Sequence, residues 1–168
     1  MTSSSGQGKR RQRFDSLVSV FYKDMYRFAA WLSRDKAIAE DVVQEALLRA
    51  WKSLESLRDD SAAKQWLLTI VRRENARYFE RRRLETVDID NLSASQAALL
   101  AEAPTEELDD LRTAIFGLED DYREPLVLQV LMGYSTNEIA EMMGLKQGAV
   151  LTRLHRARHQ LKDSVAKE

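Results

Sequence analysis

Apolar residues recur at intervals of three and four along the first half of the chain. The spacing holds through residues 14–32, 37–54 and 62–83, with polar and charged residues between the apolar ones. Because an α-helix brings positions three and four apart onto one face, each segment is predicted to be an amphipathic helix. Three helices of this length can bury their apolar faces in one core, which we expect aromatic side chains to dominate.

The helical pattern returns after a break in the second half of the chain. Residues 84–105 are mostly small or acidic and show no sustained period, so they are predicted to be a linker with room for a short helix over 93–103. Thr105 is expected to cap the helix that follows. The buried face of that helix is expected to consist of Leu108, Leu111, Ile115 and Leu118.

No segment shows the alternating pattern of a β-strand, so the predicted fold class is all-α. Ser61 is expected to cap the helix that starts at residue 62. A helix over 122–131 contains Pro125, which a helix tolerates only in its first turn. The predicted organisation is a disordered basic tail over 1–13, a helical domain of three to four helices over 14–83, a flexible linker over 84–105 and a four-helix domain over 106–168.

The stretch from Gly133 to Lys162 combines two helical patterns with a sharp corner. Ser135 or Thr136 is expected to cap the first helix, and Ser135 with Glu138 forms the pattern of a capping box. Gly144 stands where a helix C-cap glycine is expected. A second helix is predicted to begin near Gln147. Its buried side would consist of Val150, Leu154, Ala157 and Leu161. This arrangement is typical of a helix-turn-helix.

A helix-turn-helix presents the first residues of its second helix to base edges in the major groove. Gln147 can form paired hydrogen bonds with adenine, and arginines on the same helix can reach phosphates or guanine. The alternative is a packed hairpin with a solvated basic face, and the capped first helix, the Gly corner and the clustered arginines argue against it. The candidate DNA-binding residues are Lys146, Gln147, Thr152, Arg153, His155 and Arg156.

Composition narrows the class of protein further. The chain has 168 residues, of which 44% are hydrophobic and 32% charged, and it has no Cys. A disulfide framework and a thiolate metal site are therefore excluded. No apolar run approaches the roughly 18 residues of a membrane span, and none follows the basic N-terminus as in a secretory signal, so we expect a cytoplasmic protein.

The net charge of −1 conceals an alternation of basic and acidic blocks. Arginines and lysines cluster at 9–13, 72–83 and 146–162, and an acidic block over 85–124 separates the last two. Basic blocks on either side of an acidic one indicate two surfaces for a polyanion. Solvated helix faces are the alternative that charge alone would favour.

Three stretches, taken in order, resemble one protein family. The runs "AIAEDVVQEALLRAW" (37–51) and "WLLTIVRRENARYFERRR" (66–83) resemble the N-terminal domain of bacterial extracytoplasmic-function sigma factors. Residues 133–162 resemble the C-terminal promoter-binding domain of that family, and the resemblance extends over 14–162. It implies a protein that directs RNA polymerase to promoters. It also implies an anti-sigma partner, which in the family is often membrane-tethered.

The resemblance implies a role for each domain. The N-terminal domain would dock on a coiled coil of the largest polymerase subunit and open the minus-ten promoter element. The C-terminal domain would read the minus-35 element beside the flexible flap of the second large subunit. Asp41, Gln44 and Glu45 lie three and four apart and share one helix face. The polymerase-binding residues would be Asp41, Gln44, Glu45, Leu48 and Arg49.

The resemblance also places the capture of an unstacked base in the loop over 55–62. Extruding a base costs stacking energy, so such a loop needs polar contacts. Arginines on the next helix can hold phosphates. The minus-ten candidates are Arg58, Asp59, Ser61, Arg72, Arg73 and Arg77. Many family members have an Asn where this chain has Arg73, and a basic residue often stands where Leu151 does.

Other classes of protein explain less of the sequence. A stand-alone activator would not account for the polar face at 41–45, and a helical adaptor for proteins would not account for the basic recognition helix. An enzyme is the least favoured class, because no nucleophile motif or phosphate-binding loop is present. His155 and His159 lie four apart, but no carboxylate or Cys completes a metal site there. We therefore expect no catalytic residues, no metal, no cofactor and no small-molecule substrate.

Overall fold

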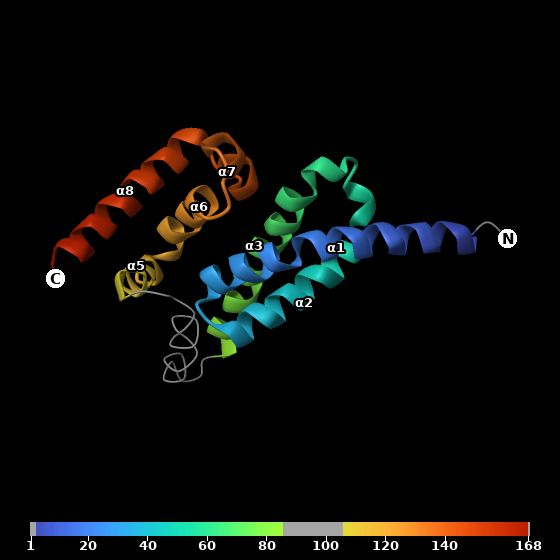
Figure 1. Cartoon of the computed structure of the whole chain (residues 1–168), viewed down its shortest axis with the longest axis horizontal. Coiled ribbons are helices and arrows are strands. Elements are labelled where there is room, and N and C mark those ends of the chain that lie inside the picture. Colours follow the sequence, from blue (N-terminus) through green and yellow to red (C-terminus); the bar gives the residue numbers. More distant parts are fainter. Residues whose placement is uncertain (1–2, 86–105, 168) are drawn as a thin grey trace.

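The structure is a computed structural model that describes residues 3–85 and 106–167 (Figure 1). The described residues form α-helices, short 3-10 turns and loops without any strand, so the prediction of an all-α fold is confirmed. The first three helices are α1 (Ser3–Ser33), α2 (Lys36–Lys52) and α3 (Ala63–Glu85), with 3-10 turns η1 (Leu54–Ser56) and η2 (Asp60–Ala62) between α2 and α3. The remaining helices are α5 (Glu106–Phe116), α6 (Asp120–Val130), α7 (Thr136–Met143) and α8 (Gln147–Ala166).

Helices α1, α2 and α3 pack on one another and form the N-terminal domain. Asp35 caps α2 by accepting a hydrogen bond from the Ile38 backbone N–H at 3.1 Å. Ala46 and Ala50 of α2 are fully buried, which lets the helices approach closely. Close crossing leaves little room for large rings, so the expectation of an aromatic core is wrong. Phe28 is the one fully buried ring of this domain, and most other buried side chains are aliphatic.

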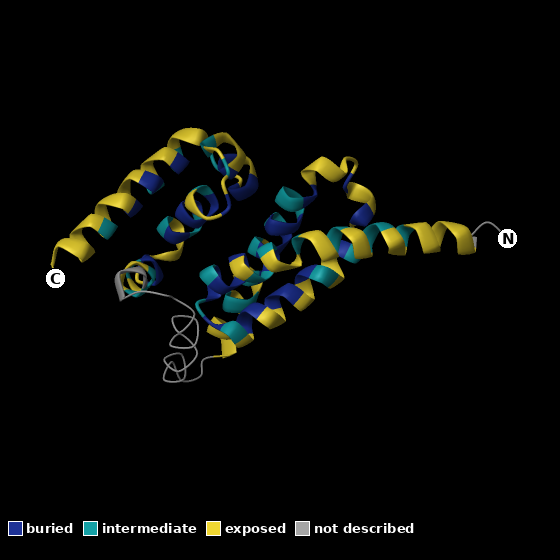
Figure 2. Ribbon diagram, viewed as in Figure 1, coloured by how far each residue is buried: buried dark blue, intermediate teal, exposed yellow. Residues whose placement is uncertain are grey.

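The start of α1 differs from the predicted disordered tail over 1–13. Residues 3–13 are helical and continuous with the rest of α1, and residues 4–9 are exposed (Figure 2). Side chains near the end of this segment hold it in place. Arg10 lies 4.5 Å from the Trp51 ring centroid, and Phe14 contacts the same ring edge-on at 5.2 Å. Because these contacts join residues about 40 positions apart, local composition could not predict the order they create.

Two further expectations about helix ends are corrected. Ser61 does not cap α3, because it lies inside η2, where Asp59 accepts a hydrogen bond from the Ser61 backbone N–H at 3.0 Å. Pro125 lies beyond the first turn of α6, inside the helix. The ring has no N–H to offer the Asp121 carbonyl. Because Asp121 is exposed, water can satisfy that carbonyl and the helix continues.

Helices α5 to α8 form the C-terminal domain, with α8 packed on α5, α6 and α7. Its core is aliphatic and includes Leu128, Ile139, Val150 and Leu154. On α5, Ile115 is buried as predicted, and so is Leu118 after the helix end, whereas Leu111 is 43% exposed. The predictions for the Leu108 side chain, the Thr105 cap, the linker from residue 86 and the short helix within it lie outside the described residues. Among the residues described, no helix has the length and hydropathy needed to cross a membrane.

The two domains pack against each other along α1 and α6, with a smaller contact between α3 and α7. Trp31 of α1 and Phe116 of α5 place their ring centroids 4.9 Å apart. Arg34 ends α1 in the left-handed conformation, with φ of 60°, and its Nη1 donates to the Phe116 carbonyl at 3.1 Å. The domains are therefore in direct contact as well as connected through the chain (Figure 1).

Candidate nucleic-acid interface

Helices α7 and α8 form the predicted helix-turn-helix. Ser135 caps α7 by accepting a hydrogen bond from the Glu138 N–H at 3.2 Å. Gly144 ends α7 with φ of 65°, and the next residue, Leu145, donates its N–H to the Ala140 carbonyl at 2.9 Å. Gln147 begins α8. The corner and the start of the second helix are confirmed, and of the two predicted cap residues the structure has Ser135.

Most of the candidate residues on α8 face solvent. Lys146, Gln147, Thr152, His155 and Arg156 are exposed. Gln147 donates from Nε2 to Thr136 Oγ1 at 3.1 Å, which orients its amide across the corner. Thr152 donates its hydroxyl to the Gly148 carbonyl at 3.0 Å, so its methyl group and its oxygen lone pairs remain available. These side chains can contact base edges without any rearrangement of the helix.

Arg153 does not share the exposure of the other candidates on α8. Its side chain is 29% exposed, and its Nη1 lies 3.6 Å from Asp121 Oδ1 at the start of α6. Arg156 is exposed and forms no ion pair within the described part of the chain. Leu151, on the same helix, is 51% exposed. Arg156 is therefore the arginine of this helix best placed to contact a phosphate or a guanine.

A second exposed patch lies on α2 and is made of Asp41, Gln44, Glu45 and Leu48, here called the α2 patch. All four side chains point to solvent, and Leu48 is 55% exposed. Arg49 borders the patch, but its Nε lies 3.3 Å from Glu74 Oε1 on α3. The patch offers carboxylates and an amide around one exposed apolar side chain.

Glu74 was not singled out in the sequence, although the structure gives it a central position. Its side chain is 2% exposed, and its Oε1 lies 3.3 Å from Arg49 Nε and 2.9 Å from Arg77 Nη1. Burial of a carboxylate requires such partners. Its position among the arginines of α3 was the signal that the sequence offered.

The loop between α2 and α3 has a buried and an exposed side. Leu54 and Leu57 are buried, while Arg58, Asp59 and Ser61 are exposed. The hydrogen bond from the Ser61 backbone N–H lowers the pKa of Asp59 and keeps its carboxylate charged. The structure therefore brings the three loop candidates together at one surface.

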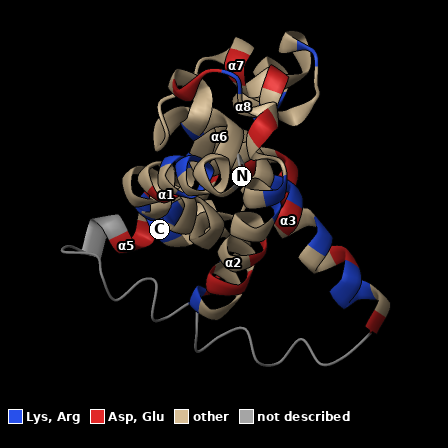
Figure 3. Ribbon diagram, turned by 90° about the vertical axis from the view of Figure 1, so that its right-hand side faces the viewer, with Lys and Arg blue, Asp and Glu red and all other residues tan. Residues whose placement is uncertain are grey.

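The three candidate arginines of α3 do not form one surface. Arg73 and Arg77 lie four apart on α3 and are both exposed, although Arg77 also pairs with Glu74, whereas Arg72 forms an ion pair with Glu124 of α6. The Arg72 side chain is 27% exposed and that of Glu124 is 14% exposed. Figure 3 shows further basic residues toward the C-terminal end of α3. In this arrangement Glu124 of the C-terminal domain already neutralises Arg72, so a polyanion that binds Arg72 has to replace this ion pair.

Arg73 lines a pocket of about 440 Å³ between α3, the α2–α3 loop and α7. Ser53, Ser56 and Trp66 contribute from the N-terminal domain, and Glu141 contributes from α7. The pocket is polar on the loop side and carries an aromatic ring, a combination that suits a planar base. The C-terminal domain forms part of its wall.

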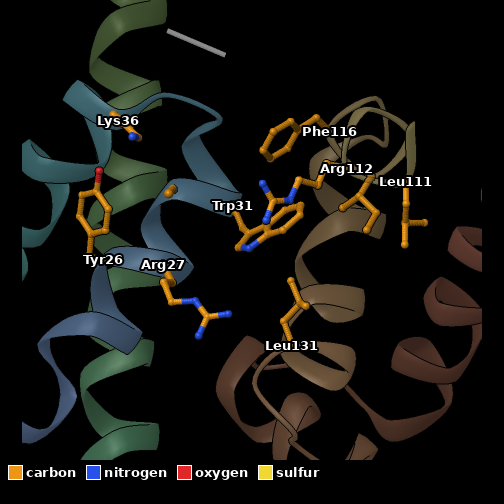
Figure 4. A pocket seen from close by; sticks show the side chains of 10 residues that line it. Tyr26, Arg27, Trp31, Lys36, Leu111, Arg112, Phe116 and Leu131 are labelled. Atoms are coloured by element: carbon orange, nitrogen blue, oxygen red, sulfur yellow. The ribbon is translucent and has the colours of Figure 1, made fainter. Parts of the chain in front are cut away.

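A second groove, of about 290 Å³, lies between α1 and the C-terminal domain (Figure 4). Figure 4 shows Trp31 from α1 facing Phe116, Arg112 and Leu131 across it. Arg27 also lines the groove from α1 and is exposed. The groove is therefore lined mainly by apolar side chains, with the cationic side chains of Arg27, Lys36 and Arg112 among them.

Arg123 is the largest fully buried side chain of the described residues, and the sequence analysis missed it. It is 1% exposed, forms an ion pair with Asp120, and donates from Nη1 to the Leu118 carbonyl at 2.6 Å. Burial lowers the pKa of Arg123, while the Asp120 carboxylate raises it. Its place as one of few cations in an acidic stretch was the only sequence signal.

Within residues 3–85 and 106–167, no group of three or more His, Cys, Asp or Glu is arranged to hold a metal ion. The imidazoles of His155 and His159 lie 6.4 Å apart by ring centroid, and His159 Nδ1 lies 3.3 Å from Asp163 Oδ2. The surfaces described above are exposed polar patches and helix faces suited to macromolecular partners.

Comparison with known proteins identifies both domains. Residues 17–85 match the family described as Sigma-70 region 2, and residues 108–161 match the one described as Sigma-70, region 4. The ECF RNA polymerase sigma factor SigM of Bacillus subtilis is 31% identical over 151 residues, which cover 88% of this chain and 92% of SigM. EcfG of Rhodopseudomonas palustris is 35% identical over 153 residues, which cover 89% of this chain and 82% of EcfG.

Solved structures agree with this assignment. The sigma factor RpoE of Bartonella quintana, solved in complex with the anti-sigma factor NepR, is 27% identical with a TM-score of 0.76, and the match covers 92% of this chain and 98% of RpoE. CnrH, solved with the cytosolic domain of CnrY, has the same fold with a TM-score of 0.68 at 24% identity and covers 94% of this chain and 90% of CnrH. The order of the two matched regions, the helix-turn-helix and the relatives together place this chain in the family of ECF RNA polymerase sigma factors.

Proposed function

We propose that this chain is a transcription initiation factor that binds core RNA polymerase and carries it to specific promoters. Its N-terminal domain opens the minus-ten element, and its C-terminal domain reads the minus-35 element. One observation carries the proposal: the exposed α2 patch and the exposed face of α8 lie on the two domains that match Sigma-70 regions 2 and 4. The factor acts by binding and has no catalytic activity of its own, and its place is the cytoplasm, where promoters and polymerase are.

The α2 patch is the proposed contact with the largest polymerase subunit. Its carboxylates and amide surround Leu48, so it suits a partner helix that offers basic side chains around an apolar position. Leu48 is 55% exposed, so a partner helix that covers it removes apolar surface from water without any rearrangement of α2. Arg49 contributes at the border and also ties α2 to Glu74.

Two surfaces are proposed for DNA. Arg156, His155, Thr152, Gln147 and Lys146 of α8 would read the minus-35 element, with Arg153 joining once it leaves Asp121. The exposed loop residues Arg58, Asp59 and Ser61 would contact an unstacked minus-ten base. On α3, Arg72, Arg73 and Arg77 would hold phosphates.

Reading both elements requires the domains to separate. The elements are about 25 base pairs apart, which is roughly 85 Å of duplex at about 34 Å per ten base pairs. In the structure, Glu124 forms an ion pair with Arg72, and Glu141 of α7 lines the same pocket as Arg73. The 20 residues over 86–105 can span at most about 70 Å when extended, so the domains and their linker together cover the required distance. We infer that the packed arrangement is the one that precedes promoter binding.

An anti-sigma factor is the proposed regulator, because the similar sigma factor RpoE is found in complex with one. A partner that keeps the domains packed would keep Arg72 paired with Glu124 and would keep α7 against the pocket that Arg73 lines. The groove in Figure 4, which combines a mainly apolar lining with the exposed cation Arg27, suits an acidic amphipathic segment.

The test is reconstitution with bacterial core polymerase. The full chain should co-purify with the core enzyme and support transcription from a subset of a promoter library. Replacing Gln44 and Glu45 together by Ala should weaken polymerase binding at least about tenfold, as expected for loss of central interface contacts. The matched control replaces Glu119 and Gln160, two exposed residues of the C-terminal domain, by Ala. Failure of the unmodified chain to bind the core enzyme would instead favour a stand-alone activator.

A further inference from the structure

The N-terminal extension of α1 contacts the loop between α2 and α3 through one guanidinium. Arg13 donates from Nη2 to the Leu57 carbonyl at 2.6 Å. The same side chain contacts Asp60 Oδ1 through Nε at 3.0 Å and through Nη2 at 2.8 Å. Leu57 follows η1 and Asp60 begins η2, so Arg13 bridges the two turns from outside the loop.

A neighbouring arginine holds the point at which the loop leaves α2. Arg10 donates from Nη2 to the Trp51 carbonyl at 2.6 Å, and its guanidinium lies 4.5 Å from the Trp51 ring centroid. Phe14, one residue after Arg13, packs edge-on against the same ring. Three residues of one α1 segment therefore fix both the start and the middle of the loop.

The other hydrogen bonds of the loop are local to one turn or the other. In η1, Ser56 donates to the Ser53 carbonyl through its N–H and its hydroxyl, and the Leu57 N–H donates to the Leu54 carbonyl. At η2, Asp59 accepts from the Ser61 N–H with its carboxylate and from the Ala62 N–H with its carbonyl, while Leu54 and Leu57 are buried beneath the loop. Between these anchors, Arg58 is exposed and has no hydrogen bond or ion pair with another described residue. The guanidinium of Arg13 bonds both to Asp60 in η2 and to the Leu57 carbonyl after η1. This long-range contact therefore fixes the orientation of η2 relative to η1.

We propose that Arg13 is a positioning residue that pre-forms the loop so that Arg58, Asp59 and Ser61 meet an unstacked promoter base together. The identity of the ligand rests on the proposed function, whereas the anchoring of the loop by Arg13 is independent of it. A loop already held in its binding shape loses less conformational freedom when the base enters. Arginine suits the task because its planar fork can hold a carboxylate and a carbonyl at once, whereas Lys offers a single point charge.

The first experiment measures the loop without DNA. Arg58 is an exposed trypsin site within the loop, so the rate of cleavage after Arg58 in the full chain reports how often the loop opens. Arg13→Ala should raise that rate roughly tenfold, which corresponds to the loss of about one net hydrogen bond to a charged group. Arg13→Lys should restore protection only in part.

The matched control is Arg11→Ala. Arg11 lies on the same turn of α1, and its side chain is 81% exposed and reaches only Asp15, at 4.0 Å. The Arg11→Ala substitution removes the same charge from the same helix without changing any contact with the loop. Asp60→Asn is a second variant, which weakens the Arg13 contact from the loop side and leaves α1 intact. Unchanged cleavage in Arg13→Ala and Asp60→Asn, or an equal rise in Arg11→Ala, would overturn the proposal.

The second experiment measures base preference. Holoenzyme reconstituted with core polymerase is incubated with a pool of single-stranded DNA randomised over six nucleotides, and the bound fraction is sequenced. The unmodified chain should select one base at the position that the loop contacts, and Arg13→Ala should reduce that preference several-fold while binding to core polymerase stays unchanged. Arg13→Ala holoenzyme that keeps full preference would contradict the positioning role. If the unmodified holoenzyme shows no preference, the proposed function fails, and the cleavage experiment still decides whether Arg13 anchors the loop.

Discussion

Arg123 of α6 donates from Nη2 to the carbonyl of Leu32, near the end of α1, at 3.0 Å. The two residues are 91 positions apart and belong to different domains. With 1% of its surface exposed, Arg123 has exchanged water for backbone carbonyls on both sides of the domain boundary. A buried charge is stable only while such partners are present, so the packed arrangement of the domains and the satisfaction of Arg123 depend on each other.

The first prediction concerns this contact. Arg123→Ala should weaken domain packing by about 3 kcal/mol, because it leaves buried carbonyl groups without a hydrogen-bond donor and leaves a cavity where the side chain was. The radius of gyration from small-angle scattering should increase and denaturant unfolding should lose its single cooperative transition. Arg156→Ala, an exposed change in the same domain, should leave both unchanged. A compact, cooperatively unfolding Arg123→Ala protein would show that Arg123 does not hold the domains.

The second prediction concerns pH and the pair of Arg72 and Glu124. Burial raises the pKa of Glu124 to about 6, and the nearby Asp120 adds to this, although Arg72 and Arg153 pull it down. The packed state thus favours the protonated carboxyl more than the separated state does. The contribution of Glu124 to packing is therefore fully present below pH 4.5, the ordinary pKa of Glu, and is lost as pH rises through about 6.

The loss of packing free energy across that interval should be on the order of 2 kcal/mol. It can be followed by the distance between fluorophores placed one on each domain, titrated from pH 4.5 to pH 7. Glu124→Gln should remove most of the dependence, because the amide does not titrate. An identical titration curve for the Glu124→Gln protein would assign the effect to another group.

The third prediction concerns the recognition helix. Arg156→Ala should weaken binding to a minus-35 DNA duplex by about 1–3 kcal/mol if Arg156 pairs with guanine. If it contacts only a phosphate, binding should weaken for all sequences and the salt dependence should fall by about one counterion. Lys162→Ala removes the same charge from a later turn of α8 and serves as the control. Equal DNA binding by the Arg156→Ala and unmodified proteins would show that α8 meets DNA with a different face.

The fourth prediction concerns the corner between α7 and α8. Gly144 has φ of 65°, and a Cβ added there would meet no atom within 4 Å. The cost of Gly144→Ala is therefore that of the backbone conformation alone, about 1–2 kcal/mol. Denaturant unfolding should detect that loss, while the circular dichroism spectrum stays helical. A stabilised Gly144→Ala protein would mean that the corner adopts another conformation in solution.

Local patterns predicted much of the fold. The amphipathic periods of the helices, the cap at Ser135 and the turn at Gly144 each depend on residues within four positions of one another, so the chain alone specified them. The same holds for the exposed face of Asp41, Gln44 and Glu45, which one helix is enough to produce. The family resemblance rested on these local features, and the comparisons confirmed it.

Long-range contacts settled what the chain could not specify. In the sequence, Arg13 and Arg123 were indistinguishable from solvated cations. In the structure, Arg13 bonds to loop residues that are 44 and 47 positions away, and Arg123 is buried between the domains. Whether a charged side chain is solvated or buried depends on which carbonyls and carboxylates the folded chain brings within about 3 Å of it. A hydrogen bond has that short range, whereas the partners here are separated by dozens of residues, so their meeting follows from the packing of whole helices.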